Sequence, residues 1–119
     1  MSELAGVIRE AHIQRQVLDY LHLRGIPATR NQAGHVHVGA SWINLGSPGW
    51  PDIIACWRGR FLGIEVKRPG EEPSEEQRRV HEELAAAGAI VLIVHSLEDL
   101  VFALRGLQTS AKHLTTRQG

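Results

Sequence analysis

Two apolar runs, residues 53–57 and 61–66, constrain the fold of this chain more than any other feature. They flank the short polar sequence Arg-Gly-Arg, a pattern typical of a β-hairpin with a tight turn. If the turn is a two-residue one, Asp52 lies directly opposite Glu65. Because side chains alternate along a strand, these two carboxylates then share one face of the hairpin with Lys67.

The shared face carries an electrostatic conflict. Directly opposed side chains have Cβ atoms about 5 Å apart, and two carboxylates at ~4 Å repel each other by about 4 kcal/mol near a protein surface. A divalent cation reverses the sign of this interaction, and two hard oxygen ligands suit Mg²⁺, with Mn²⁺ as a substitute. We therefore predict a Mg²⁺ site at Asp52 and Glu65. Lys67 lies beside it, placed to orient or deprotonate a water or to neutralise charge on a phosphate oxygen.

The alternative is an ordinary hairpin with one solvated charged face and a pair between Glu65 and Lys67. The same face, however, also carries Ile54, Cys56 and Gly63. These residues are too apolar for a fully solvated surface, so we favour the metal site over the solvated hairpin.

Length and charge set the frame for the remaining predictions. With 119 residues the chain is expected to form one domain, residues 1–108, followed by a flexible tail at 109–119. Lys plus Arg and Asp plus Glu both number 13, so the net charge is zero and any nucleic-acid-binding surface has to be local. The lone Cys56 excludes a disulfide framework, a four-Cys zinc site and a cysteine-held iron–sulfur cluster. We expect it to be a small buried hydrophobe.

The sequence also bears on the cellular compartment. No stretch approaches the ~20 apolar residues of a membrane span. The first residues, Met-Ser-Glu, lack the basic-then-apolar order of a signal peptide. We therefore expect a cytoplasmic protein that does not bind a membrane.

Residues 8–24 have the apolar spacing of a helix that ends before a glycine. The stripe formed by Ile13, Val17 and Leu21 is predicted to face the core. Glu10 falls on the same stripe. Burying a carboxylate there costs several kcal/mol of folding free energy unless the group is protonated, paired or bound to metal. Glu10 is therefore either a third acidic group pointing back at the hairpin or a first-turn residue that complements the helix dipole.

Residues 26–45 are predicted to form one or two strands. His35 and His37 share a face in this pattern and could bind a transition metal. No third ligand lies nearby in the sequence, so we favour solvated strand histidines.

Other side chains near the hairpin allow two interpretations. Arg30, Asn31 and Gln32 could supply phosphate contacts beside the site, or they could be ordinary polar residues of an edge strand. Trp42 and Trp50 lie in a turn-rich approach to the hairpin and could stack on unpaired bases. Tryptophans more often fill the core beneath a loop, and that is the interpretation we adopt.

A second helix is predicted after the hairpin. Ser74 and Gln77 have the spacing of a capping box, which opens a helix that continues to Ala87. Gln77 and Arg78 then lie on the first turn, where free N–H groups favour a phosphate or a water on the metal. The alternative role for Gln77 is that of a capping partner alone.

The last part of the predicted core is a strand followed by a helix. Residues 89–94 are an apolar run of strand length, expected to be buried and parallel to an earlier strand. A short helix over residues 97–104 follows, capped by Ser96. The polar, aperiodic sequence after it is the basis for the predicted tail.

Taken in order, these residues resemble a known nuclease superfamily. The chain is similar to the PD-(D/E)XK nucleases, and within them to the VRR-NUC family, whose small members resemble Holliday junction resolving enzymes of phages and archaea. The resemblance implies a phage or prokaryotic origin. The resemblance spans about residues 8–104. The residues that carry it are the helical Glu10, the Gly-Trp-Pro-Asp sequence ending at Asp52, the Glu65-Val-Lys67 sequence, and Gln77.

The resemblance implies a fold and a role for each matching residue. The implied fold is the restriction-endonuclease-like α/β core, a mixed central β-sheet flanked by helices. The implied metal ligands are Glu10, Asp52, Glu65 and the backbone carbonyl of Val66. The implied catalytic residues are Asp52, Glu65, Lys67 and Gln77, with Gln77 supporting the lysine or the substrate. The side chains expected to contact DNA are Arg30, Asn31, Arg68 and Arg78.

The function expected from the carboxylate pair and the family resemblance is Mg²⁺-dependent cleavage of DNA. The leading hypothesis is a structure-selective endonuclease that resolves four-way (Holliday) junctions as a homodimer, since paired cuts on two strands call for two active sites. The alternatives are a flap or duplex nickase of replication or repair, and a catalytically silent nucleic-acid-binding module.

Overall fold

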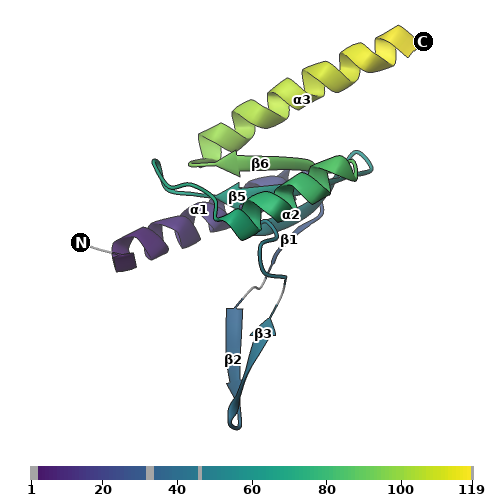
Figure 1. Ribbon diagram of the computed structural model, residues 1–119. Coiled ribbons are helices and arrows are strands. Elements are labelled where there is room, and N and C mark those ends of the chain that lie inside the picture. The colour runs from purple at the N-terminus through teal and green to yellow at the C-terminus, as the bar shows by residue number, and fades with distance from the viewer. Residues whose placement is uncertain (1–2, 32–33, 46, 119) are drawn as a thin grey trace.

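The computed structural model describes residues 3–31, 34–45 and 47–118 of the chain. Four strands form one sheet in the order β1-β4-β5-β6, and β2 and β3 form a separate two-stranded hairpin (Figure 1). Within the larger sheet only β5 and β6 run parallel, so the sheet is mixed, as predicted. The elements are α1 (Glu3–Leu23), β1 (Ala28–Arg30), β2 (Gly34–Val38), β3 (Ser41–Leu45), β4 (Ile53–Trp57), β5 (Arg60–Val66), α2 (Glu75–Ala86), β6 (Ile90–Val94) and α3 (Leu97–Gln118).

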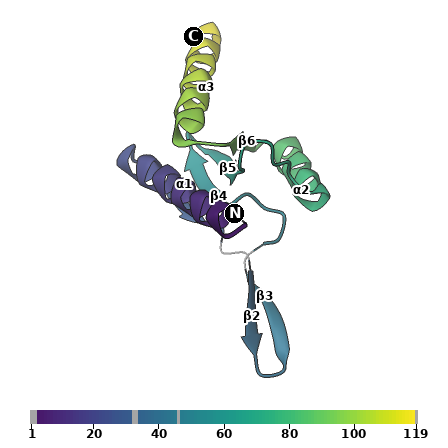
Figure 2. The ribbon, with the colours of Figure 1, turned by 90° about the vertical axis from the view of Figure 1, so that its left-hand side faces the viewer.

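The helices cover the two faces of the sheet unequally. Figure 2 shows α1 and α3 on one side of the sheet and α2 on the other, with the β2–β3 hairpin projecting away from the body. The hydrophobic core lies between the sheet and the α1–α3 layer, where Val17 and Leu21 of the predicted helix stripe are fully buried. The strands contribute alternate residues to the same cluster, among them Ile53, Leu62 and Ile64. This layering is the α/β architecture expected from the sequence.

The β4–β5 hairpin has the predicted register. Ile53 pairs with Ile64, and Trp57 pairs with Arg60. The two turn residues between the strands, Arg58 and Gly59, have positive φ angles of 51° and 80°, as a type I′ turn requires. The register fixes which residues meet at the far end of the hairpin, where the chain enters β4 and leaves β5.

Strand β5 is buried on both faces at residues 62–66. Leu62 and Ile64 point into the main core, so Gly63 and Glu65 point to the opposite face. There the sheet meets Pro51, which is fully buried. A Cβ added at Gly63 would lie 2.6 Å from Pro51 Cγ, so only glycine lets the approach loop pack this closely on β5.

Both long helices extend beyond their predicted bounds. Helix α1 begins at Glu3 rather than at residue 8, and the side chain of Arg68 packs on this added part at Gly6. Helix α3 runs to Gln118 rather than ending at residue 104. Residues 109–118 are therefore helical rather than aperiodic, and the flexibility predicted for this tail stays a prediction. The segment contains good helix formers and no proline, and Leu107 packs against the core.

Two other expectations differ from the structure. Residues 26–45 form three short strands rather than one or two. Cys56 is exposed rather than buried. The reason is that α2 packs against β6 and the end of β5, which leaves this face of β4 uncovered. Among the described residues, no helix combines the length and apolar composition needed to cross a membrane.

The tight contact between Gly63 and Pro51 makes a testable prediction. Gly63→Ala should destabilise the protein by about 1–3 kcal/mol, because the added methyl forces the buried proline or the strand to move. Thermal unfolding followed by circular dichroism should show a melting temperature lower by roughly 4 °C or more. Gly106→Ala is the matched control, since nothing lies within 4 Å of its added Cβ and it sits in helix α3. Equal melting temperatures for the two variants would contradict the packing argument.

Candidate active site

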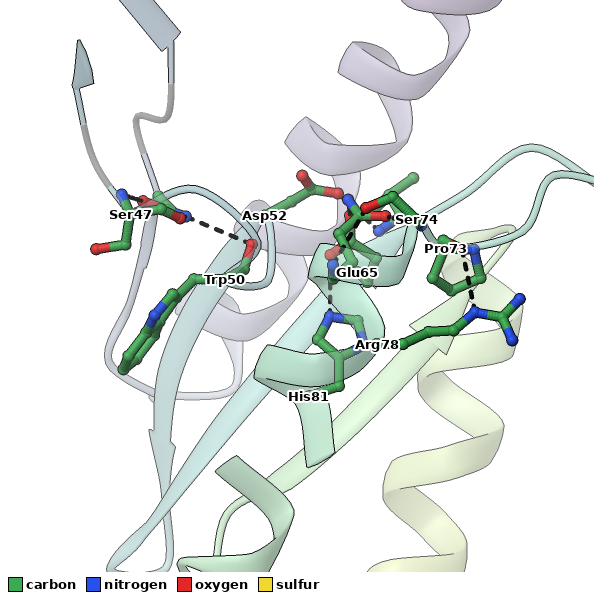
Figure 3. A network of polar contacts seen from close by, with 11 residues as sticks. Ser47, Trp50, Asp52, Glu65, Pro73, Ser74, Arg78 and His81 are labelled. Atoms are coloured by element: carbon green, nitrogen blue, oxygen red, sulfur yellow. Dashed lines mark hydrogen bonds and ion pairs between the residues drawn. The ribbon is translucent and has the colours of Figure 1, made fainter. Parts of the chain in front are cut away.

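The side chain at the centre of the site is Glu65. It lies near the end of β5 with 1% of its surface exposed, and among the described residues it is the one charged side chain that is buried. An isolated carboxylate in such a place costs several kcal/mol unless hydrogen bonds or a proton compensate it. Helix α2 supplies two partners: Gln77 Nε2 donates to Glu65 Oε2 at 3.3 Å, and His81 Nε2 lies 3.3 Å from Glu65 Oε1 (Figure 3).

Asp52 is brought to Glu65 by the hairpin register. It immediately precedes β4, and its Oδ2 accepts a hydrogen bond from the backbone N–H of Val66 at 2.8 Å. Its own backbone carbonyl accepts from the N–H of Asn31 at 2.8 Å, which ties the start of β4 to the end of β1. The predicted meeting of the two carboxylates is thus present, and the backbone of neighbouring strands holds it in place.

Burial and the neighbouring Asp52 favour the protonated form of Glu65 in the metal-free protein. Burial is the main cause that raises the pKa of Glu65, to about 9, and the hydrogen bond and negative charge of Asp52 add to the rise. The positive charge of Lys67 and the negative charge of Glu10 act on the same pKa more weakly, in opposite directions. At neutral pH Glu65 therefore holds a proton that a cation would have to displace.

Helix α2 is positioned by its cap. Ser74 Oγ accepts from the N–H of Gln77 at 3.1 Å, and Gln77 Oε1 accepts from the N–H of Ser74 at 2.8 Å, which is the predicted capping box. The amide nitrogen of the same Gln77 is left to donate to Glu65. Gln77 is thus both the capping partner and a site residue, and within the described contacts it supports Glu65 rather than Lys67.

The sequence analysis missed His81. It lies four residues after Gln77, so both side chains fall on the face of α2 that packs over β5. Burial is the main cause that lowers the pKa of His81, with a smaller contribution from Lys67. The i, i+4 spacing was the available signal, but it points to the site only once the packing of α2 on Glu65 is known.

Lys67 is fixed through its backbone. Its N–H donates to the carbonyl of Val94 at 3.0 Å. Its carbonyl accepts from His95 Nδ1 at 2.8 Å, while the N–H of His95 donates to Asp99 Oδ2. The half-buried lysine side chain therefore starts from a backbone that β6 and α3 hold in place.

Glu10 faces the protein rather than solvent, but its main partner is an arginine. Its Oε1 lies 3.4 Å from Arg68 Nε, and Arg68 also pairs with Glu71 at 3.3 Å. Burial is the main cause that raises the pKa of Glu10, and a hydrogen bond with Glu71 is the next. That same hydrogen bond is the main cause that lowers the pKa of Glu71 to about 2.

The three carboxylates predicted as metal ligands are not gathered into one cluster. Across residues 3–31, 34–45 and 47–118, no group of three or more His, Cys, Asp or Glu side chains could hold a metal ion. The structure brings Asp52 and Glu65 together and leaves Glu10 in the Arg68 cluster. Two hard carboxylates that repel each other unless a proton or a cation lies between them are chemically suited to Mg²⁺. The roles of Glu10 and of the Val66 carbonyl as ligands stay predictions.

The side chains predicted to contact DNA are largely used within the protein. The Asn31 amide spans the approach loop: its Nδ2 donates to the carbonyl of Ser47 at 3.0 Å, and its Oδ1 accepts from the N–H of Ser47 at 3.1 Å. Arg78 donates to the carbonyl of Pro73 and pairs with Glu72. Arg68 is held between two glutamates, as described above.

Two further residues named from the sequence are Arg30, the last residue of β1, and Trp50, in the approach loop. The Nε of Arg30 is buried without a hydrogen-bond partner among the described residues. Trp50 is 36% exposed rather than buried beneath its loop, and its ring meets Phe61 edge-on. Gln32 and the side chains of His35, His37 and Trp42 lie outside the part of the chain that the structure describes.

Comparison with known proteins places this fold. No family model matches the chain. A protein named "Putative nuclease p44" of Acyrthosiphon pisum secondary endosymbiont phage 1 is 36% identical over 56 residues, which is 46% of this chain and 60% of the phage protein. The matched region thus spans less than two thirds of that relative. A solved structure described as a VRR_NUC domain superposes with a TM-score of 0.61 and 21% sequence identity, covering 82% of this chain and 95% of the other.

The chain therefore has the fold of a VRR_NUC domain, as the resemblance seen in the sequence implied. The phage relative carries the name of a nuclease.

The raised pKa of Glu65 predicts how stability depends on pH. The folded protein keeps a proton on Glu65 up to about pH 9, whereas the unfolded chain releases it near the ordinary value of 4.5. The stability of the metal-free protein should therefore fall as pH rises through this window. Glu65→Gln removes the titrating group, so at mildly alkaline pH its melting temperature should exceed that of the wild type by about 4 °C or more.

The control for this experiment is Glu83→Gln, at an exposed position on α2. This variant should follow the wild type at every pH. Melting temperatures measured in chelator from about pH 5 to about pH 8 give the comparison. The same pH slope for wild type and Glu65→Gln would show that Glu65 is not held protonated.

Proposed function

We propose that this protein is a Mg²⁺-dependent DNA endonuclease that cuts branched DNA, with the four-way junction as its main substrate. The observation that carries the proposal is the pair of carboxylates at Asp52 and Glu65, with Lys67 on the same face at the end of β5. A buried carboxylate that is costly without a cation is typical of a catalytic site rather than of a structural one. The fold supports the same class of reaction.

Asp52 and Glu65 would hold the metal. When bound, Mg²⁺ neutralises charge on the phosphate and activates a water for attack on phosphorus. The proton on Glu65 must leave before the two carboxylates can act together as ligands, so activity should rise with pH. Gln77, through its bond to Glu65 Oε2, keeps that carboxylate oriented toward Asp52 while the helix cap keeps Gln77 in place.

Lys67 would act on the substrate directly. Its ammonium carries three donors on a flexible stem and can neutralise negative charge that develops on a phosphate oxygen, or orient the attacking water. The hydrogen bonds of its backbone to Val94 and His95 restrict where that stem begins. His81 lies against the opposite oxygen of Glu65 from Gln77 and so helps to fix the carboxylate plane.

The choice of a four-way junction rests on symmetry. One active site cuts one strand, so resolution of a junction by paired cuts requires two protomers, and we propose a homodimer. The phage relative is named as a nuclease, without a stated substrate.

Replacement of Asp52 tests the catalytic proposal. Asp52→Asn should lower nicking of a synthetic four-way junction in Mg²⁺ by at least about 100-fold, because it removes one of two charged ligands, while the variant still binds the junction. Asp19→Asn is the matched control: Asp19 is an exposed residue of α1, paired with Arg15, and its replacement should leave the rate unchanged. Gel assays with end-labelled strands, in Mg²⁺ and in chelator, measure both effects.

The same assay separates the proposal from its rivals. Symmetric cuts near the branch by the wild type support junction resolution. If the wild type cuts a flap or linear duplex but not the junction, the protein is a nickase rather than a junction-resolving enzyme. If it cuts no substrate with any divalent ion, it is a nucleic-acid-binding module without catalytic activity.

A further inference from the structure

Trp50 stands in a loop that the structure holds rigidly. The loop begins at Ser47, whose backbone N–H and carbonyl both bond to the Asn31 side chain. The N–H of Trp50 donates to the carbonyl of Ser47 at 3.1 Å, and its carbonyl lies 3.5 Å from Asn31 Nδ2. The backbone that carries the indole is thus fixed from the side of β1.

Both sequence neighbours of Trp50 are packed tightly. Gly49 has a φ of 82°, and a Cβ added to it would lie 2.9 Å from Val80 Cγ2. Pro51 is fully buried against Gly63. The residue between them is nevertheless 36% exposed, so the loop presses its backbone onto α2 and β5 while it holds a large aromatic side chain outward. In Figure 3 the Trp50 ring points away from Glu65, along the outside of the site.

The ring itself is oriented but not covered. Its contact with Phe61 is edge-on, with ring centroids 5.8 Å apart and an interplanar angle of 82°. In this arrangement the edge of one ring meets the face of the other, so at least one face of the indole is free of Phe61. Phe61 also lines an apolar cavity of about 540 Å³ on the uncovered part of the sheet, which extends the apolar surface beyond Trp50.

We propose that Trp50 is a stacking platform for an unpaired nucleobase next to the cleaved phosphate. The inference rests on the proposed nuclease function and adds to it a residue that selects DNA with unstacked bases. Trp50 precedes Asp52 by two residues in a bent stretch of the loop, so their Cα atoms lie at most about 7 Å apart. A base on the free indole face would therefore belong to a nucleotide close to the phosphate at the carboxylate pair.

If Trp50 stacks on an unpaired base, its replacement weakens binding to DNA that contains unpaired bases and not to fully paired DNA. One base on one aromatic ring typically contributes about a tenfold or larger gain in affinity. Trp50→Ala should therefore weaken binding to a duplex with a short bulge or flap by about tenfold and leave binding to a fully paired duplex unchanged. Trp50→Phe keeps a stacking face, so its affinity for the bulged or flapped duplex should fall by less than about threefold. Phe102→Ala is the control, because Phe102 is an 82% exposed aromatic residue on α3. It should change neither the affinity for bulged or flapped DNA nor the affinity for fully paired DNA.

The experiment measures the anisotropy of fluorescently labelled DNA in chelator, so it requires neither cleavage nor metal. Equal losses on bulged and paired DNA, or no loss with Trp50→Ala, would overturn the stacking proposal. If the wild type binds bulged DNA through Trp50 but cuts no DNA in Mg²⁺, the result contradicts the nuclease proposal and supports the stacking proposal. If the wild type cuts DNA and Trp50→Ala binds as well as the wild type, only the platform falls. Melting curves of all variants confirm that each is folded.

Discussion

The contact between Glu65 and Asp52 places two carboxylates together where the sheet, the approach loop and helix α2 meet. Burial raises the pKa of Glu65 to about 9, so the metal-free protein keeps a proton in this contact. Everything around the pair limits the cost of burying it. The N–H of Val66 bonds to Asp52, and Gln77 and His81 bond to Glu65. A purely structural position would be filled more cheaply by an apolar side chain, which is why a carboxylate here indicates chemistry.

The elements that stabilise the fold are the same ones that position this site. Pro51 packs on Gly63 and so fixes the entry of the chain into β4 at Asp52. The capping box starts α2 at a point from which Gln77 reaches the buried carboxylate. Arg68 links helix α1 to the loop after β5 through ion pairs on both sides. The site is thus preorganised by backbone contacts and by side chains that are themselves held, as a catalytic constellation requires.

Local patterns in the sequence were sufficient for the hairpin register, the meeting of Asp52 with Glu65, and the capping box at Gln77, because turn residues and strand alternation determine them within a short stretch. Contacts between distant elements were not predictable in this way. His81 joins the site only because α2 crosses β5, and Arg68 was expected to bind DNA but lies between two glutamates. The exposed face of β4 likewise depends on how the helices cover the sheet.

We expect the site at Asp52 and Glu65 to exchange the proton on Glu65 for a divalent cation. Calorimetric titration of the metal-free protein with Mg²⁺, repeated in buffers of different ionisation enthalpy, counts the protons released for each ion bound. We predict one saturable site at neutral pH and release of about one proton per ion, with both lost in Glu65→Gln. Absence of saturable binding, or unchanged binding and proton release in Glu65→Gln, would contradict the claim.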